Sequence, residues 1–316
     1  MTADIGIMKI GVYKASLDRL FVDGIRMKTE LLTSTANETF KFLTTSYRRL
    51  FTNIFKVKLI SSLVLVLTLV LSFVSFMGAM GFVPLMYLIM LLIAIAIFFI
   101  GLFMSFVADS VGYNVVDAVF KDQGVGFWES FRKNMLPMLK FVLISLLIAT
   151  VALSPVFVLY FIIYAAVYVG ESSTAGILLV ELIEILLRIL SSIIQAVLYL
   201  FLQFTVFELL IARKGAIESF KQSFGIVKEN FIETIVFSFV LWGIGTVIGI
   251  PFIIVGVVLV FGGLLLGAGG GGLLMLPLIF MGVLIFIVLL LIYSTITVAV
   301  VLSAQYVYWN KIKRAA

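Results

Sequence analysis

Cysteine and histidine are both absent from this 316-residue chain. Without them the protein has no disulfides, no thiolate or imidazole metal ligands, no haem ligation by those groups, and no Cys or Ser-His nucleophile. Proton relays built on histidine are excluded as well. Few reactions inside a membrane proceed without His, Cys or clustered carboxylates. We therefore expect no enzyme activity, no metal site and no cofactor.

Charge is also scarce. Only 12% of the residues are charged and 63% are hydrophobic, with a mean hydropathy of +1.28, and this composition indicates a polytopic membrane protein. A helix needs about 20 apolar residues to cross a hydrocarbon core of about 30 Å. Long continuous apolar runs predict helices rather than barrel strands. Six stretches reach that length, at about 59–81, 83–107, 141–169, 189–212, 235–266 and 273–303.

The few basic residues are unevenly placed. All but one of the 22 Lys and Arg lie in 1–58, beside the links after spans two and four, or in the tail, whereas the three opposite loops carry none. The positive-inside rule then predicts both termini and both long links in the cytoplasm, as in a multi-pass protein of the cell membrane. Basic residues in 1–58 also argue against a signal peptide. The glycine-rich loop 267–272 lacks the Lys of a phosphate-binding loop and predicts a flexible turn.

A similar amphipathic segment precedes three of the spans. The third reads AIESFKQSFGIVKENF at 216–231, the first has matching spacing over 40–54, and the middle one shares a Glu-Ser-Phe-basic motif at 129–132. We expect each segment to lie at the cytoplasmic interface with its aromatic stripe in lipid. The candidate contacts with lipid or a partner protein are Phe40, Lys41, Arg48, Phe51, Phe131, Arg132, Phe220, Lys221, Lys228 and Phe231.

The predicted fold class is an all-α integral membrane protein with six transmembrane helices in three parallel repeats, each an interfacial amphipathic helix plus a helical hairpin. Residues 1–38 form a cytoplasmic N-terminal segment, either a surface helix or a docking segment. Residues 39–316 form a single six-span membrane domain. Its repeats cover about 39–107, 115–212 and 214–303, with a cytoplasmic tail at 304–316.

The 216–231 segment, echoed at 40–51 and 129–132, resembles the interfacial segment of multi-span membrane domains associated with glycerophosphodiester phosphodiesterases and of related prokaryotic membrane proteins of unknown function. The resemblance implies architecture and membrane location. It does not imply phosphodiesterase activity, because that chemistry needs His and metal-binding carboxylates in a separate soluble domain.

The stretch 176–212 carries an unusual polar face. Its residues share one side of a helix, because successive residues rotate by about 100°. They are Glu181, Glu184, Arg188, Ser192, Gln195, Tyr199 and Gln203. A helix over the whole stretch would be roughly 55 Å long, nearly twice the hydrocarbon thickness.

Three interpretations of this face stay open. In the first, 177–188 lies on the outer surface with its charges in water, and only 189–212 spans. In the second, a tilted continuous helix holds Glu184 and Arg188 in the bilayer and marks a solute or proton path. In the third, the polar side chains bond to packed neighbouring helices and are purely structural.

Two acids lie near the predicted cytoplasmic boundary, Asp109 after span two and Glu208 at the inner end of span four. We expect them to anchor the interface, although two facing carboxylates could instead carry a proton. The small residues Gly243, Gly245 and Gly249, with Gly256 further on, predict close helix packing at span five.

The leading functional prediction is a non-enzymatic membrane scaffold or accessory subunit that engages anionic lipid or a partner protein at the inner leaflet. The alternative is a transporter or channel for a small solute or ion that uses the polar face of span four. The net charge of +6 sits beside the spans, which indicates anionic headgroups rather than nucleic acid as its partner. A membrane-protein partner or a second copy of the chain is a further expected partner.

Overall fold

The computed structural model describes residues 3–79, 84–169, 174–268 and 275–315, and they form helices joined by short links, without a β-strand in those ranges. Six helical stretches are long and apolar enough to cross a membrane, which confirms the predicted all-α class with six candidate spans. The helices are α1 (Ala3–Ala79), α2 (Pro84–Phe120), α3 (Phe127–Val169), α4 (Thr174–Leu202), α5 (Thr205–Leu210), α6 (Ala216–Glu229), α7 (Phe231–Ala268) and α8 (Met275–Ala315).

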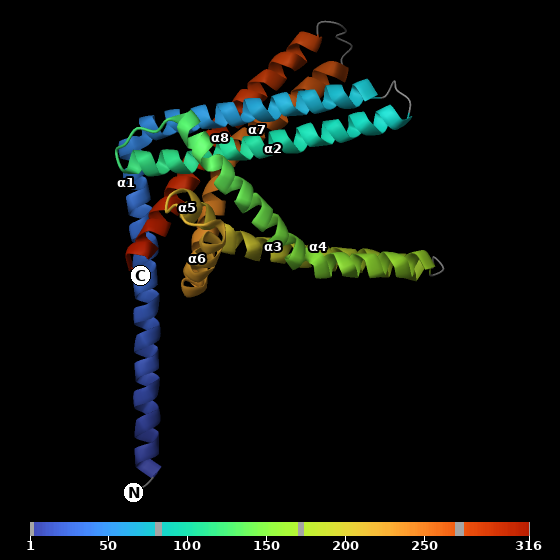
Figure 1. Cartoon of the computed structure of the whole chain (residues 1–316). Coiled ribbons are helices and arrows are strands. Elements are labelled where there is room, and N and C mark those ends of the chain that lie inside the picture. The colour runs from blue at the N-terminus through green and yellow to red at the C-terminus, as the bar shows by residue number, and fades with distance from the viewer. Residues whose placement is uncertain (1–2, 80–83, 170–173, 269–274, 316) are drawn as a thin grey trace.

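Three helical hairpins organise the molecule. Helices α1 and α2, α3 and α4, and α7 and α8 pack in pairs, and α8 also packs on α1 and α2. Figure 1 shows the three hairpins extending from one common region as separate arms, while the N-terminal part of α1 leaves that region in another direction. We call the common region the base. It comprises α5, α6, the N-terminal ends of α3 and α7, the C-terminal ends of α2 and α8, and the middle of α1.

The hydrophobic core lies in the base rather than between the arms. Leu50 and Ile54 of α1, Val111 of α2, Phe207 of α5 and Tyr308 of α8 are all buried in one cluster there. Most large apolar side chains along the arms are exposed instead, among them Phe73, Phe99, Phe161, Leu146 and Ile253. Such surfaces are costly in water and suit a hydrocarbon solvent.

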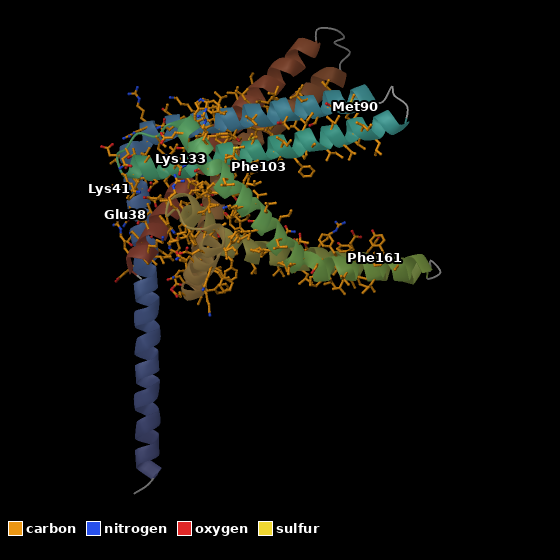
Figure 2. All side chains as sticks on the ribbon, viewed as in Figure 1. Glu38, Lys41, Met90, Phe103, Lys133 and Phe161 are labelled. Carbon is orange, nitrogen blue, oxygen red and sulfur yellow. The ribbon has the colours of Figure 1, made fainter. Side chains whose placement is uncertain are left out.

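Figure 2 shows the same division. The labelled Glu38, Lys41 and Lys133 lie around the base, whereas Met90 and Phe161 lie along the arms. The helices are therefore joined mainly at the polar end of the molecule, and the apolar arms diverge from it.

Helix α4 ends before the predicted inner end of span four, and the apolar candidate span Glu181–Leu210 includes the short helix α5. Helix α4 stops at Leu202, Gln203 and Phe204 form a turn, and the next six residues make the short helix α5. Every residue of α5 is buried. Residues 203–212 are mostly apolar, but their side chains pack into the base. Arg213 then takes a left-handed φ of 56°, which redirects the chain toward α6.

Of the three predicted interfacial segments, only the third is a separate helix, α6. The first is continuous with its span inside α1, and the second is continuous with its span inside α3, where Pro137 lies within the helix. Helix α1 also runs without a break through the predicted boundary at 38/39. The threefold repeat and the division of the chain at residue 38 thus stay predictions.

Glycine allows close packing in two arms. A Cβ at Gly249 of α7 would lie 3.1 Å from the Tyr293 hydroxyl of α8, and one at Gly256 would lie 2.6 Å from the Phe286 ring. The predicted close packing at span five is confirmed for these two positions, although Gly243 faces open space. In the first arm, Thr68 of α1 occupies the place where Gly101 of α2 would carry a side chain. The predicted glycine-rich turn at 267–272 lies largely outside the described residues.

Candidate functional site

The outer part of the polar face lies on the exposed side of α4. Arg188 donates to Glu184 at 2.5 Å on the same helix, and 72% of the Arg188 side chain is exposed. The phenol of Tyr160 on α3 lies beside the Arg188 guanidinium. Ser192 donates to the Arg188 carbonyl at 2.9 Å, and Glu181 is exposed. The hydrogen bonds made by this part of α4 thus stay within its own hairpin.

The middle of the face follows the same pattern. Gln195 is exposed, and its side-chain nitrogen donates to Ser191 at 3.1 Å, again within α4. Glu184, Arg188 and Gln195 therefore do not meet polar groups from the other two arms in the described structure.

The inner end of the face opens onto a groove of about 440 Å³ between α4, α7 and α8. Tyr199 and Gln203 line it from one side, and Ser238, Thr246 and Tyr293 are among its polar residues on the other. Ser238 donates to the Gln203 side-chain oxygen at 3.2 Å. The Gln203 side-chain nitrogen is buried and has no hydrogen-bond partner among the described residues. The seven predicted residues thus divide into an exposed outer set and an inner pair at this groove.

Glu208 is the most enclosed charged side chain of the base. It is fully buried on α5, accepts from the Trp309 indole at 2.8 Å, and pairs with Lys313 at 2.9 Å and Lys214 at 3.3 Å. Lys313 also lies 4.6 Å from the centroid of the Trp309 ring, in cation-π geometry. This cluster joins α5 to the C-terminal end of α8.

Asp109 has a different partner, Lys58 of α1, at 3.0 Å. Because Asp109 and Glu208 are each bonded to lysines of their own, the structure does not bring them together as the facing carboxylates of a proton site. Each of the two acids ties helices together, and their role as anchors at the membrane interface stays a prediction.

Further polar contacts fix the base. Arg49 of α1 pairs with Asp122 at 2.5 Å, and Lys311 of α8 pairs with Glu38 of α1 at 3.1 Å. The Tyr306 hydroxyl donates to Asp117 at 2.7 Å. These bonds connect α1, the end of α2 and α8, so the base is held by charged pairs as well as by its apolar core.

The predicted lipid or partner contacts lie around the base and are exposed to different extents. Phe231 and especially Phe40 are exposed, as are the five cations of the set, whereas Phe51, Phe131 and Phe220 are half-buried. The five cations are Lys41, Arg48, Arg132, Lys221 and Lys228.

The aromatic residues of α6 are only partly directed outward. Phe220 stacks on Phe141 at 5.5 Å, and Phe224 stacks on Phe201 at 4.4 Å while staying half-exposed. The side of α6 that is fully buried carries Ser219, Ser223 and Val227 instead. Small side chains there let α6 approach the inner end of α4, where Ser223 donates to the Phe201 carbonyl.

Sequence reasoning missed the partners of Glu208. Trp309 and Lys313 lie four residues apart and hence on one face of α8, which was a usable signal for a polar contact at the end of span six. It also missed Trp128, an exposed indole beside the basic residues of α3.

No family model, no curated protein and no solved structure matches this chain. The class of protein follows from the helices themselves. With six helices long and apolar enough to span, and with apolar arms joined at a polar base, the chain is a multi-pass helical membrane protein.

Proposed function

We propose that the protein is a non-enzymatic scaffold or accessory subunit of the cytoplasmic membrane whose base lies at the inner leaflet and holds anionic lipid headgroups. The observation that carries this proposal is the division of the molecule. Its buried core and charged contacts gather in the base, and its arms expose apolar side chains along their length. Both termini and the base would face the cytoplasm, in line with the distribution of Lys and Arg.

The charge of the base supports a lipid ligand. Lys41, Arg48, Arg132, Lys221 and Lys228 are exposed, and none of them makes an ion pair within the part of the chain that the structure describes. Each basic residue close to an anionic leaflet contributes about 1 kcal/mol of attraction, which decays within a Debye length. Several such residues around one base would retain anionic lipids in preference to zwitterionic ones.

Transport of a small solute or ion along α4 is the second proposal. Its support is the groove lined by Tyr199 and Gln203, with neutral polar groups from α7 and α8. Glu184 and Arg188 lie outside that lining and pair with each other. The groove therefore lacks the charged residues that a charge-selective path would use, and we place this function second.

Kinship with the membrane domains associated with glycerophosphodiester phosphodiesterases is also a proposal, and it rests on the resemblance of the 216–231 segment alone. A role in organising lipid at the inner leaflet is compatible with it and does not depend on it.

Lipid retention by the purified protein tests the scaffold proposal. The double variant Lys221→Gln/Lys228→Gln should lower the ratio of anionic to zwitterionic lipid that co-purifies in mild detergent by at least several-fold, because two exposed cations are lost. The matched control is Lys121→Gln/Lys133→Gln. It removes the same charge from two lysines that already pair with Asp117 and Glu129. An equal change in both variants would contradict headgroup binding by α6.

Solute and proton flux in liposomes separates the two functions. We expect liposomes that contain the parent protein, Arg188→Ala or Glu184→Gln to show the same flux rate as liposomes without protein. Flux that is present in the parent and abolished by either substitution would overturn the scaffold proposal in favour of transport.

A further inference from the structure

The early end of α4 changes the depth at which Arg188 lies. Helix α4 has 29 residues, which gives a length of about 43 Å. A bilayer with its headgroup regions is about 40–45 Å thick. If the span ends with α4, the surplus over the hydrocarbon core falls from about 25 Å to about 13 Å, because residues 203–212 pack into the base.

Arg188 is then placed by counting from the base. Leu202, the last residue of α4, lies about 21 Å along the helix axis from Arg188. If Leu202 lies at the outer limit of the inner headgroups, Arg188 reaches the middle of the bilayer. If Leu202 lies at the edge of the hydrocarbon, Arg188 lies a few ångströms beyond the middle. In both placements the guanidinium is inside the hydrocarbon core, whose half-thickness is about 15 Å.

An arginine at that depth needs polar partners, since ionisable groups in spans almost always face other polar groups or water. Glu184 compensates the charge and the Tyr160 phenol lies beside the guanidinium, but a guanidinium carries five N–H donors and these two partners do not satisfy all of them. The Arg188 side chain is 72% exposed, so most of its surface would face lipid in a single copy of the chain.

The spacing of the polar residues on α4 matches a helix–helix seam. Glu181, Glu184, Arg188, Ser191 and Gln195 follow one another at alternating steps of three and four, which is the a/d pattern of a two-stranded coiled coil. Polar side chains at such positions hold transmembrane helices together, because hydrocarbon offers them no other partners.

The seam is complementary to itself. Glu184 and Arg188 carry opposite charges and lie one helical turn apart on the same face of α4. When two parallel copies of α4 are related by a two-fold axis along the membrane normal, Arg188 of each copy lies at the depth where it can reach Glu184 of the other. A two-fold contact of this kind uses the same patch on both copies and closes as a dimer.

We infer that a second copy of this chain docks on the Glu181-to-Gln195 seam of α4, forming a parallel dimer in which Arg188 and Glu184 pair across the interface. The inference rests on the part of the proposed function that places the base at the inner leaflet, because the depth of Arg188 is counted from there, and it does not depend on lipid binding by the base. Gln195 pairs with its counterpart near the inner end of the seam, and Glu181 marks its outer end.

Cysteine cross-linking in native membranes tests the interface directly, because the chain has no cysteine of its own. Gln195→Cys should give a disulfide-linked dimer on oxidation. The matched control is Ile193→Cys, at nearly the same depth but on the opposite side of α4, where the side chain is also exposed. Ile193→Cys should stay monomeric. Equal cross-linking at both positions, or none at Gln195→Cys, would overturn the inference.

Complementary charge variants test the pairing. Arg188→Glu leaves the seam with three acidic side chains and no cation, and Glu184→Arg places two cations one helical turn apart, so each variant alone should lose at least tenfold in recovery of a differently tagged copy of itself. Co-expressed, the two variants should recover each other at the parental level, and this recovery also shows that both fold. Unimpaired self-association of either variant would show that another surface holds the copies together. If another helix of the same chain packs on the α4 seam instead, the parent protein should be monomeric. That result would also overturn the inference.

Discussion

At the scale of residues, Glu208 shows how an ordinary boundary acid becomes a structural anchor. An acid near the end of an apolar stretch can be read from the sequence, but its full burial cannot, because Trp309 and Lys313 come from a helix about a hundred residues later. Burying a carboxylate is costly unless it is paired and hydrogen-bonded, and here it is both.

Removing this carboxylate should destabilise the base. Glu208→Leu leaves the Lys313 and Lys214 ammonium groups and the Trp309 indole without their partner, and breaking a buried pair typically costs about 3–5 kcal/mol. We expect a clearly lower midpoint of thermal unfolding in detergent, with partial recovery in Glu208→Leu/Lys313→Met. Glu129→Gln, which alters an exposed pair within one helix, is the control and should leave the midpoint nearly unchanged. A parental midpoint for Glu208→Leu would show that the cluster does not hold the base.

The polar face of α4 shows what residue spacing can and cannot predict. Helical periodicity correctly placed Glu184 and Arg188 within reach of each other. It gave no information on the neighbouring arms, and so it could not predict that Gln203 would meet Ser238 of α7 while Gln195 would bond only within α4.

At the scale of elements, the spans were largely predictable and their ends were not. Long apolar runs identified the six helices. The break at Gln203 was hidden because residues 204–212 are apolar apart from Thr205 and Glu208 and carry no Pro or Gly, so neither residue type marks the end of the helix. Helix α6 begins after Gly215 and ends at Asn230, whereas α1 continues as one helix through Asn53 in the first segment.

The close approach of α1 and α2 gives a test at this scale. A side chain at Gly101 would overlap Thr68, whose Cβ lies 2.5 Å from the expected Cβ position. Gly101→Ala should therefore force the helices apart and cost about 1–3 kcal/mol of stability, as overpacking does elsewhere. Thr68→Gly should restore the contact in the double variant. Gly243→Ala, which meets open space on α7, is the control and should be neutral in the same thermal-unfolding assay. Equal effects of the two alanine substitutions would argue against tight packing at Gly101.

At the scale of the whole molecule, the arrangement explains why composition alone indicates a membrane protein but not its role. Apolar side chains are spread along the arms, while charged pairs join distant parts of the sequence in the base, as Lys311 does with Glu38. Hydropathy alone predicts the apolar surface of the arms. The charged pairs of the base depend on contacts between helices that are distant in the sequence, and the proposed function rests on these pairs.

Trp128 offers a direct probe of that function. It is an exposed indole on the first turn of α3, one turn from the exposed Arg132, whereas Trp309 is buried. Replacing the exposed Trp242 of α7 by Phe leaves Trp128 as the accessible reporter at the base. Its fluorescence can then be titrated with brominated lipids of the same acyl composition and different headgroup.

The decisive measurement is the quenching of Trp128 by brominated phosphatidylglycerol compared with brominated phosphatidylcholine, at low and high salt. If the base holds anionic lipid, the anionic lipid should quench at several-fold lower mole fraction, and high salt should reduce the difference because the attraction is screened. Equal quenching by the two lipids at low salt would contradict the proposal that the base selects anionic headgroups.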